Sequence, residues 1–139
     1  MMKKNDPISQ IMTKNVLTIQ NDSNLHDVIS LIRKHHIRHV PVLKGKKVVG
    51  IISRTDVNRL TFGALFEDED RVDEPILNML TIPQVMTGSP QTVNVADSIK
   101  KVAEVLVQAD YHALPVEDDG NIVGIVTTTD LIRYLLDQY

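Results

Sequence analysis

The feature that most constrains this chain is an internal repeat, in which Met12 and Met86 begin two stretches that match at a constant offset of 74 residues. The pairs are Met12-Thr13 and Met86-Thr87, Thr18 and Thr92, Val28 and Val102, Pro41-Val42 and Pro115-Val116, Val49-Gly50-Ile51 and Val123-Gly124-Ile125, and Thr55-Asp56 and Thr129-Asp130. The register runs from Met12 to Asp56 without a gap. A fixed period of this kind indicates two copies of one supersecondary unit that bury their apolar faces together.

Each copy has the pattern strand, helix, strand, strand, helix. Apolar residues recur at helical spacing after the candidate caps Asp22 and Ser23, and again after Asp97. The first set is Leu25, Val28, Ile29 and Ile32, and the second is Ile99, Val102, Ala103 and Leu106. These patterns predict one amphipathic helix in each copy.

A hairpin and a second helix follow in each copy. Residues 39–43 and 47–53 are rich in β-branched side chains and are joined around Gly45, and the second copy has Asp119-Gly120 at the matching place. Thr55 and Thr129 then open further helices. The predicted fold class is therefore α/β (α+β), with two β-α-β-β-α repeats.

The predicted organisation is a first repeat over 11–62, a connector over 63–84 and a second repeat over 85–139. Residues 11–62 contain nine Lys or Arg and three Asp or Glu, a net charge of +6, whereas residues 85–139 contain three and eight, a net charge of −5. The connector carries the acidic run 67–70 and then Pro75, which favours a short helix. It is interpreted as a solvated connector, or alternatively as a docking segment for a partner.

The bulk composition excludes several classes of protein. No apolar run approaches the roughly 20 residues of a membrane span, and the first residues lack the apolar region of a signal peptide, so we expect a cytoplasmic protein without membrane contact. With no cysteine, the chain has no thiolate metal site and no cysteine nucleophile. A net charge of −3 gives no reason to expect nucleic-acid binding. Neither a nucleophile elbow nor a glycine-rich phosphate loop is present, so we do not expect an enzyme or a required cofactor.

The histidines His35, His36 and His39 form the single histidine cluster of the chain. His35 and His39 have the spacing of one helix face, but no carboxylate stands at a matching spacing nearby, and the predicted helix ends between them. We interpret them as surface histidines and expect no metal.

The duplicated pattern of an apolar residue with Pro-Val, then Val-Gly-Ile, then Ser/Thr-x-x-Asp resembles the tandem CBS-domain pair, also called a Bateman module. Through Ile37-Arg38-His39-Val40-Pro41-Val42 the chain is most similar to small stand-alone bacterial proteins of the acetoin-utilisation type. The resemblance implies an intramolecular pseudo-dimer of the two repeats with two clefts that bind adenosine-containing ligands.

The resemblance also implies the ligand-binding residues. It assigns a ribose carboxylate to Asp56 and Asp130, a phosphate-side hydroxyl to Ser53 and Thr127, and adenine contacts to the region of Val16 and Pro90. Arg38 and His39 are its phosphate candidates. The second repeat departs from this pattern, since His112-Ala113 replaces Arg38-His39.

The residues themselves fit this chemistry. A carboxylate can accept both ribose hydroxyls, and a hydroxyl beside free backbone N–H groups at a helix start suits a phosphate. Ser53, Arg54, Thr55 and Asp56 supply these groups in the first repeat, and Thr127, Thr129 and Asp130 supply them in the second. The alternative is purely structural: both aspartates are first-turn helix charges, and Thr55 and Thr129 are helix caps.

The leading hypothesis is a sensor that binds AMP, ADP or ATP and signals through the packing of a homodimer or through an unidentified effector protein. The alternatives are a ligand-free interaction module and a sensor of another adenosyl ligand, such as S-adenosylmethionine or a cyclic dinucleotide. We predict a homodimer, because the last helix carries a larger number of apolar side chains than one small sheet can cover, notably Leu131, Ile132, Leu135 and Leu136.

Overall fold

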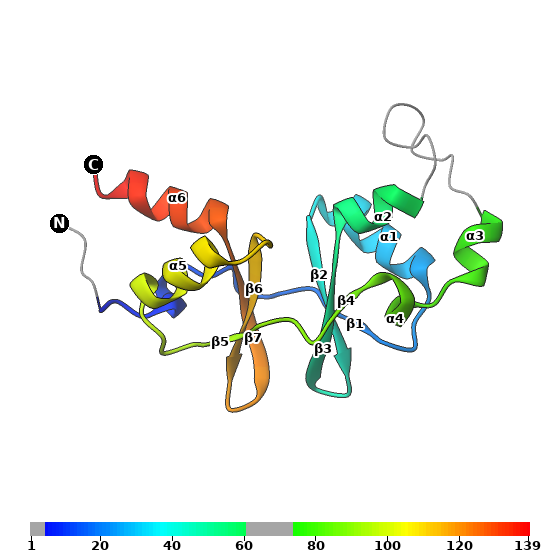
Figure 1. Cartoon of the computed structure of the whole chain (residues 1–139), viewed down its shortest axis with the longest axis horizontal. Coiled ribbons are helices and arrows are strands. Elements are labelled where there is room, and N and C mark those ends of the chain that lie inside the picture. The colour runs from blue at the N-terminus through cyan, green and yellow to red at the C-terminus, as the bar shows by residue number, and fades with distance from the viewer. Residues whose placement is uncertain (1–4, 61–73) are drawn as a thin grey trace. The chain divides into compact units, whose positions relative to one another are not determined.

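The computed structural model describes residues 5–60 and 74–139 (Figure 1). The chain divides into two compact units, which we call the central unit, Leu17–Pro90, and the split unit, Met1–Val16 with Gln91–Tyr139. Each unit is one small sheet with helices packed on it, which confirms the predicted mixed α and β fold class.

The central unit contains the first repeat. Its elements are β1 (Ile19–Gln20), α1 (Leu25–His35), β2 (His39–Lys44), β3 (Lys47–Ser53), α2 (Arg54–Leu60), α3 (Glu74–Met79), α4 (Ile82–Val85) and β4 (Thr87–Gly88). The strand order is β1-β2-β3-β4, with β1 parallel to β2 and the other neighbours antiparallel. The predicted strand-helix-strand-strand-helix pattern is confirmed here.

The split unit contains the second repeat and repeats this plan. Its elements are the 3-10 helix η1 (Ile8–Gln10), β5 (Val93–Asn94), α5 (Ile99–Gln108), β6 (Ala113–Asp118), β7 (Asn121–Thr127) and α6 (Thr128–Asp137). The strand order is β5-β6-β7, and β5 runs parallel to β6. Both hairpins carry a register shift at the same place, between Val42 and Leu43 and between Val116 and Glu117.

The hairpin turns are the predicted ones, but the first helices begin at other caps. Gly45, Asp119 and Gly120 all have positive φ, the backbone region that tight hairpins require. The cap of α1 is Asn24, whose side chain accepts a hydrogen bond from the Asp27 N–H, and the cap of α5 is Ser98. The predicted caps Asp22, Ser23 and Asp97 were therefore wrong, because the residue that caps each helix is the one immediately before its first residue.

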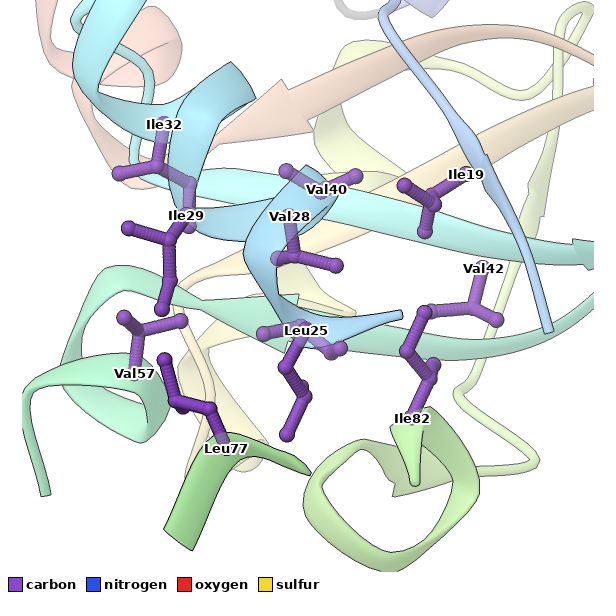
Figure 2. Packing of buried hydrophobic residues seen from close by; sticks show 11 residues of the cluster. Ile19, Leu25, Val28, Ile29, Ile32, Val40, Val42, Val57, Leu77 and Ile82 are labelled. Atoms are coloured by element: carbon purple, nitrogen blue, oxygen red, sulfur yellow. The ribbon is translucent and has the colours of Figure 1, made fainter. Parts of the chain in front are cut away.

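The segment before each repeat completes the core of the other repeat. Ile82 of α4 is fully buried in the central unit, where Figure 2 shows it directed toward Val42 and Leu25. Ile8 of η1 is fully buried in the split unit, in the same cluster as Val102. The compact units therefore do not follow the repeat boundaries. The segment before the second repeat packs into the first repeat, and the segment before the first repeat packs into the second.

The repeated Met-Thr and Val-Gly-Ile motifs mark where these segments attach. Met86 lies against Gly50, and Thr87–Gly88 forms β4 beside β3. Met12 lies against Gly124, and Thr13 pairs with Ile125 in an isolated bridge. A side chain at either glycine would collide with the methionine, which explains why both positions are glycine.

Part of the connector lies outside the described residues, including the acidic run 67–70. The predicted short helix near Pro75 is present as α3, and Leu77 on it is buried in the core of the central unit (Figure 2). Among the described residues no helix is long and apolar enough to cross a membrane.

Candidate functional site

The Ser/Thr-x-x-Asp motif forms a closed pair of hydrogen bonds where β3 passes into α2. The Ser53 N–H donates to Asp56 Oδ2 at 2.9 Å, and the Asp56 N–H donates to Ser53 Oγ at 3.0 Å. The other carboxylate oxygen, Asp56 Oδ1, lies 4.0 Å from Arg59 Nη1. The aspartate side chain is 20% exposed, and Oδ1 can accept a hydrogen bond from a further donor beside its Arg59 pair.

The second repeat reproduces this turn where β7 passes into α6. The Thr127 N–H donates to Asp130 Oδ2 at 2.9 Å, and the Asp130 N–H donates to Thr127 Oγ1 at 3.2 Å. Asp130 Oδ1 lies 3.7 Å from Arg133 Nη1, and the aspartate side chain is only 8% exposed. The two turns share one backbone and capping geometry but differ in how open the carboxylate is.

These bonds correct the prediction of the caps. The residue that caps α6 is Thr127, and Ser53 makes the equivalent bonds before α2, whereas Thr55 and Thr129 lie inside the helices and are exposed. Ser53 and Thr127 are therefore structural caps, and both aspartates have a structural role. A ligand role is compatible with this, because each hydroxyl keeps its proton to donate and each aspartate keeps Oδ1 to accept.

The strand before each turn brings a second set of predicted residues alongside it. The Arg54 N–H donates to the Arg38 carbonyl oxygen at 2.7 Å, and His39 stands opposite Ser53 in the β2–β3 ladder. Arg38 and Arg54 are both exposed. The first repeat thus holds two exposed arginines at backbone positions that adjoin the Ser53 turn.

In the second repeat the same positions are occupied by other residue types. The Thr128 N–H donates to the His112 carbonyl oxygen at 3.0 Å, and Ala113 stands opposite Thr127 in the β6–β7 ladder. Thr128 therefore replaces Arg54, His112 replaces Arg38, and Ala113 replaces His39. The two turns are built alike, and each has an arginine paired with its aspartate, but only the first has two further arginines at the positions of Arg38 and Arg54.

Val16 and Pro90 each belong to a different compact unit from the turn of their own repeat. Val16 is the last residue of the first segment of the split unit, whereas Ser53 and Asp56 belong to the central unit. Pro90 is the last residue of the central unit, whereas Thr127 and Asp130 belong to the split unit. Their predicted contacts with adenine stay predictions.

Sequence reasoning missed Arg59 and Arg133, which form ion pairs with the second carboxylate oxygens, Asp56 Oδ1 and Asp130 Oδ1. Both arginines stand three residues after the motif aspartate, and the offset between them is that of the repeat. This spacing places them on the aspartate's face of the helix. Among the described residues no group of three or more His, Cys, Asp or Glu side chains could hold a metal ion.

The chain belongs to the CBS domain family. The model of the CBS domain matches residues 8–62 and 82–137, one match for each repeat together with the segment before it. The uncharacterized protein MJ1426 of Methanocaldococcus jannaschii is 32% identical over 154 residues, which cover 93% of this chain and 90% of that protein. The chain spans about half the length of two further relatives from the same organism, 44% of MJ0188 and 48% of MJ1225.

Solved structures of CBS domain pairs share the fold. The CBS domain pair of protein MJ0100, crystallised with 5'-methylthioadenosine and S-adenosyl-L-methionine, has a TM-score of 0.78 and 26% identity and covers 96% of this chain and 98% of that one. A Vibrio cholerae protein assigned to acetoin utilization (AcuB) has a TM-score of 0.76 and 22% identity over 96% and 92% of the two chains. The fold of a CBS domain pair, a regulatory module, is thereby established for this chain.

Proposed function

We propose that this chain is a regulatory module that binds an adenosine-containing ligand at its Ser/Thr-x-x-Asp turns and that the turn of the first repeat selects an adenine nucleotide. The observation that carries the proposal is the duplicated turn, in which one carboxylate oxygen of the aspartate caps the helix and the other, paired with an arginine, can still accept a hydrogen bond from a ligand. A ribose supplies two hydroxyl donors for such an oxygen. The ligands named for the MJ0100 pair are adenosyl compounds, which supports the same ligand class here.

The phosphate preference follows from the side chains beside the first turn. Arg38 and Arg54 are joined through their backbones next to Ser53 in the chain and its strand ladder, and both side chains are exposed, so two guanidinium groups can reach a phosphate bound at this turn. Arginine binds phosphate through charge-assisted, often bidentate hydrogen bonds. AMP, ADP or ATP therefore suits the first repeat better than an uncharged adenosyl ligand.

The second turn favours a ligand with less negative charge. His112 and Thr128 replace the two arginines of the first turn. An adenosyl ligand without phosphates, of the S-adenosylmethionine or methylthioadenosine class, fits this turn. The alternative for the whole chain is a ligand-free interaction module, in which both turns serve as helix caps alone.

Binding has no regulatory effect unless it is passed on, and we propose that it changes how the protein packs with a second copy or with an effector protein. We propose no catalytic residue for this chain and no required cofactor. It acts without nucleic acid in this proposal, and we place it in the cytoplasm.

Isothermal titration tests the proposal with AMP, ADP, ATP, adenosine and S-adenosylmethionine as ligands. The proposal predicts measurable heat with at least one nucleotide and tighter binding of nucleotides than of adenosine. Mass spectrometry of small molecules released from the purified protein supplies an independent result. No heat at millimolar concentration with any of the five, together with no bound adenosyl compound, would leave the ligand-free module as the function.

A further inference from the structure

A methionine fastens the end of each segment that packs before a repeat. We call these segments the straps, residues 8–13 in the split unit and residues 82–87 in the central unit. A Cβ at Gly50 would collide with the sulfur of Met86, and a Cβ at Gly124 would collide with the sulfur of Met12. Each thioether therefore fills the space over its strand that a side chain at the glycine would take.

Each methionine is also the last apolar residue of its strap. The opposite end of each strap is anchored by a fully buried isoleucine, Ile8 or Ile82. The threonine that follows each methionine, Thr13 or Thr87, is exposed and pairs with the neighbouring strand through its backbone. The thioether is thus the apolar contact that holds this backbone pairing in place.

The two methionines are open to a small oxidant, because both are only partly buried. The chain has no cysteine, so methionine supplies all of its sulfur. In the reaction with hydrogen peroxide, the thioether sulfur attacks one peroxide oxygen, the O–O bond breaks, an S–O bond forms and water leaves. The sulfur loses the two electrons that the peroxide gains, and the product is a polar sulfoxide.

A sulfoxide does not suit the place where each thioether lies. Gly50 stands in the sheet between Val42 on one side and Gly88 on the other. The N–H and C=O groups of a strand point along the sheet toward such neighbours and not out of its face. A sulfoxide oxygen over the face would therefore lose contact with water without gaining a hydrogen bond, which favours release of the methionine.

We propose that Met12 and Met86 are redox latches: oxidation by a peroxide detaches the end of each strap from its strand. Enzymatic reduction of the sulfoxide with electrons from thiols, which removes the oxygen as water, re-attaches it. Each strap continues into the first strand of the other repeat, β1 or β5, so its release loosens the chain where that repeat begins. Neither reaction involves the proposed ligand, and the test is made without one.

Amide hydrogen exchange before and after treatment with hydrogen peroxide tests the latches. The Ser89 N–H donates to the Val49 carbonyl oxygen at 3.0 Å and reports on the strap of Met86. The Thr13 N–H donates to the Ile125 carbonyl oxygen at 2.8 Å and reports on the strap of Met12. Oxidation should speed the exchange of both amides by about tenfold or more, and methionine sulfoxide reductase should restore the original rates.

Leucine substitutions assign the effect to single sulfurs, because leucine is apolar, close to methionine in volume and inert to peroxide. Met86→Leu should make the Ser89 amide insensitive to peroxide and leave Thr13 sensitive, and Met12→Leu should do the reverse. Met79→Leu is the matched control. Met79 is 80% exposed on α3, outside both straps, so this variant should respond as the wild type does.

Peptide mass spectrometry shows which methionines have gained an oxygen. The proposal would be overturned if Met12 and Met86 stayed unmodified at a dose that fully oxidises Met79, or if both became sulfoxides without faster exchange. A folded double leucine variant that still lost protection would also overturn it. Should the leucine variants fail to fold, the wild type decides the matter, since exchange that stayed fast after full reduction of the sulfoxides would contradict a reversible latch.

Discussion

The two Ser/Thr-x-x-Asp turns have the same backbone and different surroundings. Reciprocal hydrogen bonds between the cap residue and the aspartate occur in both, at 2.9 and 3.0 Å in the first repeat and at 2.9 and 3.2 Å in the second. The neighbouring pair is Arg38 with Arg54 in one and His112 with Thr128 in the other. The comparison teaches that helix capping keeps the turn in place, while the residues next to it are free to set which ligand binds.

The largest effects on stability should come from the two short segments that each precede one repeat and complete the core of the other. Ile8→Ala removes a fully buried side chain from the split unit, and Ile82→Ala removes one from the central unit. Each change should lower the free energy of unfolding by about 2–5 kcal/mol. Hydrogen exchange should show lost protection in β6 and β7 for Ile8→Ala and in β2 and β3 for Ile82→Ala.

Each variant is the control for the other. If Ile8→Ala loosened the first repeat, which follows it directly in the sequence, the crossed arrangement of the segments would be wrong.

The aspartates come next, because each has two roles that substitution can separate. Asp56→Ala and Asp130→Ala should each weaken ligand binding at their own turn by about tenfold to a hundredfold, or about 1.5–3 kcal/mol. Loss of the cap should also lower stability by about 0.5–2 kcal/mol. Titration and thermal melts measure the two effects.

Asparagine at the same positions separates the roles, because it keeps an oxygen for the Ser53 or Thr127 N–H but loses the charge. We expect Asp56→Asn to melt near the wild type and still bind less tightly. An Asp56→Asn variant with wild-type affinity would mean that the carboxylate caps the helix and does nothing more.

The glycines of Val-Gly-Ile should respond unequally. A Cβ at Gly124 would meet the Thr13 carbonyl oxygen at 2.9 Å as well as the Met12 side chain, whereas the three atoms nearest to a Cβ at Gly50 all belong to the Met86 side chain. Gly124→Ala should therefore cost about 1–3 kcal/mol and Gly50→Ala less. Chemical denaturation measures both.

A second substitution shows whether the methionines cause the cost. Met86→Ala should relieve Gly50→Ala, and Met12→Ala should relieve Gly124→Ala only in part because the backbone oxygen remains. Full rescue in both repeats would contradict the difference between them.

The smallest effect is an acid sensitivity confined to the second repeat. The Asn94 N–H, which donates to Asp97 at 2.9 Å, and the nearby Lys101 lower the pKa of Asp97 below its ordinary value of 3.8. A lowered pKa stabilises the folded state above the ordinary value, and that stability is lost as the pH falls through the folded value. Below about pH 4 Asp97→Asn should therefore lose less stability than the wild type, as melts across that range would show.

The repeat, the helical spacing of its apolar residues and its segments rich in β-branched side chains were sufficient to predict both β-α-β-β-α units. The hairpins followed from Gly45 and Asp119-Gly120, whose positive φ values are those the turns need. Local rules of turn chemistry and periodicity act within a few residues, so they can be read from a sequence.

The packing of the segment before each repeat into the other repeat could not be predicted in this way, because it depends on tertiary contacts between distant residues. Met12 and Gly124 both appeared as repeated motifs, but nothing in the sequence says which methionine lies on which glycine. The capping roles of Ser53 and Thr127 were missed for a related reason, since several hydroxyls stand near each helix start and backbone geometry selects one.

The central claim is that the first turn selects phosphate through its arginines, and exchanging residues between the repeats tests it most directly. The double variant Arg38→His with Arg54→Thr gives the first turn the residues of the second turn at these two positions. Titration of this variant and the wild type with ADP and with adenosine should show ADP binding weakened by about tenfold or more and adenosine binding nearly unchanged, because only phosphates meet the guanidinium groups. Equal weakening of ADP and adenosine, or no weakening of either, would contradict the account.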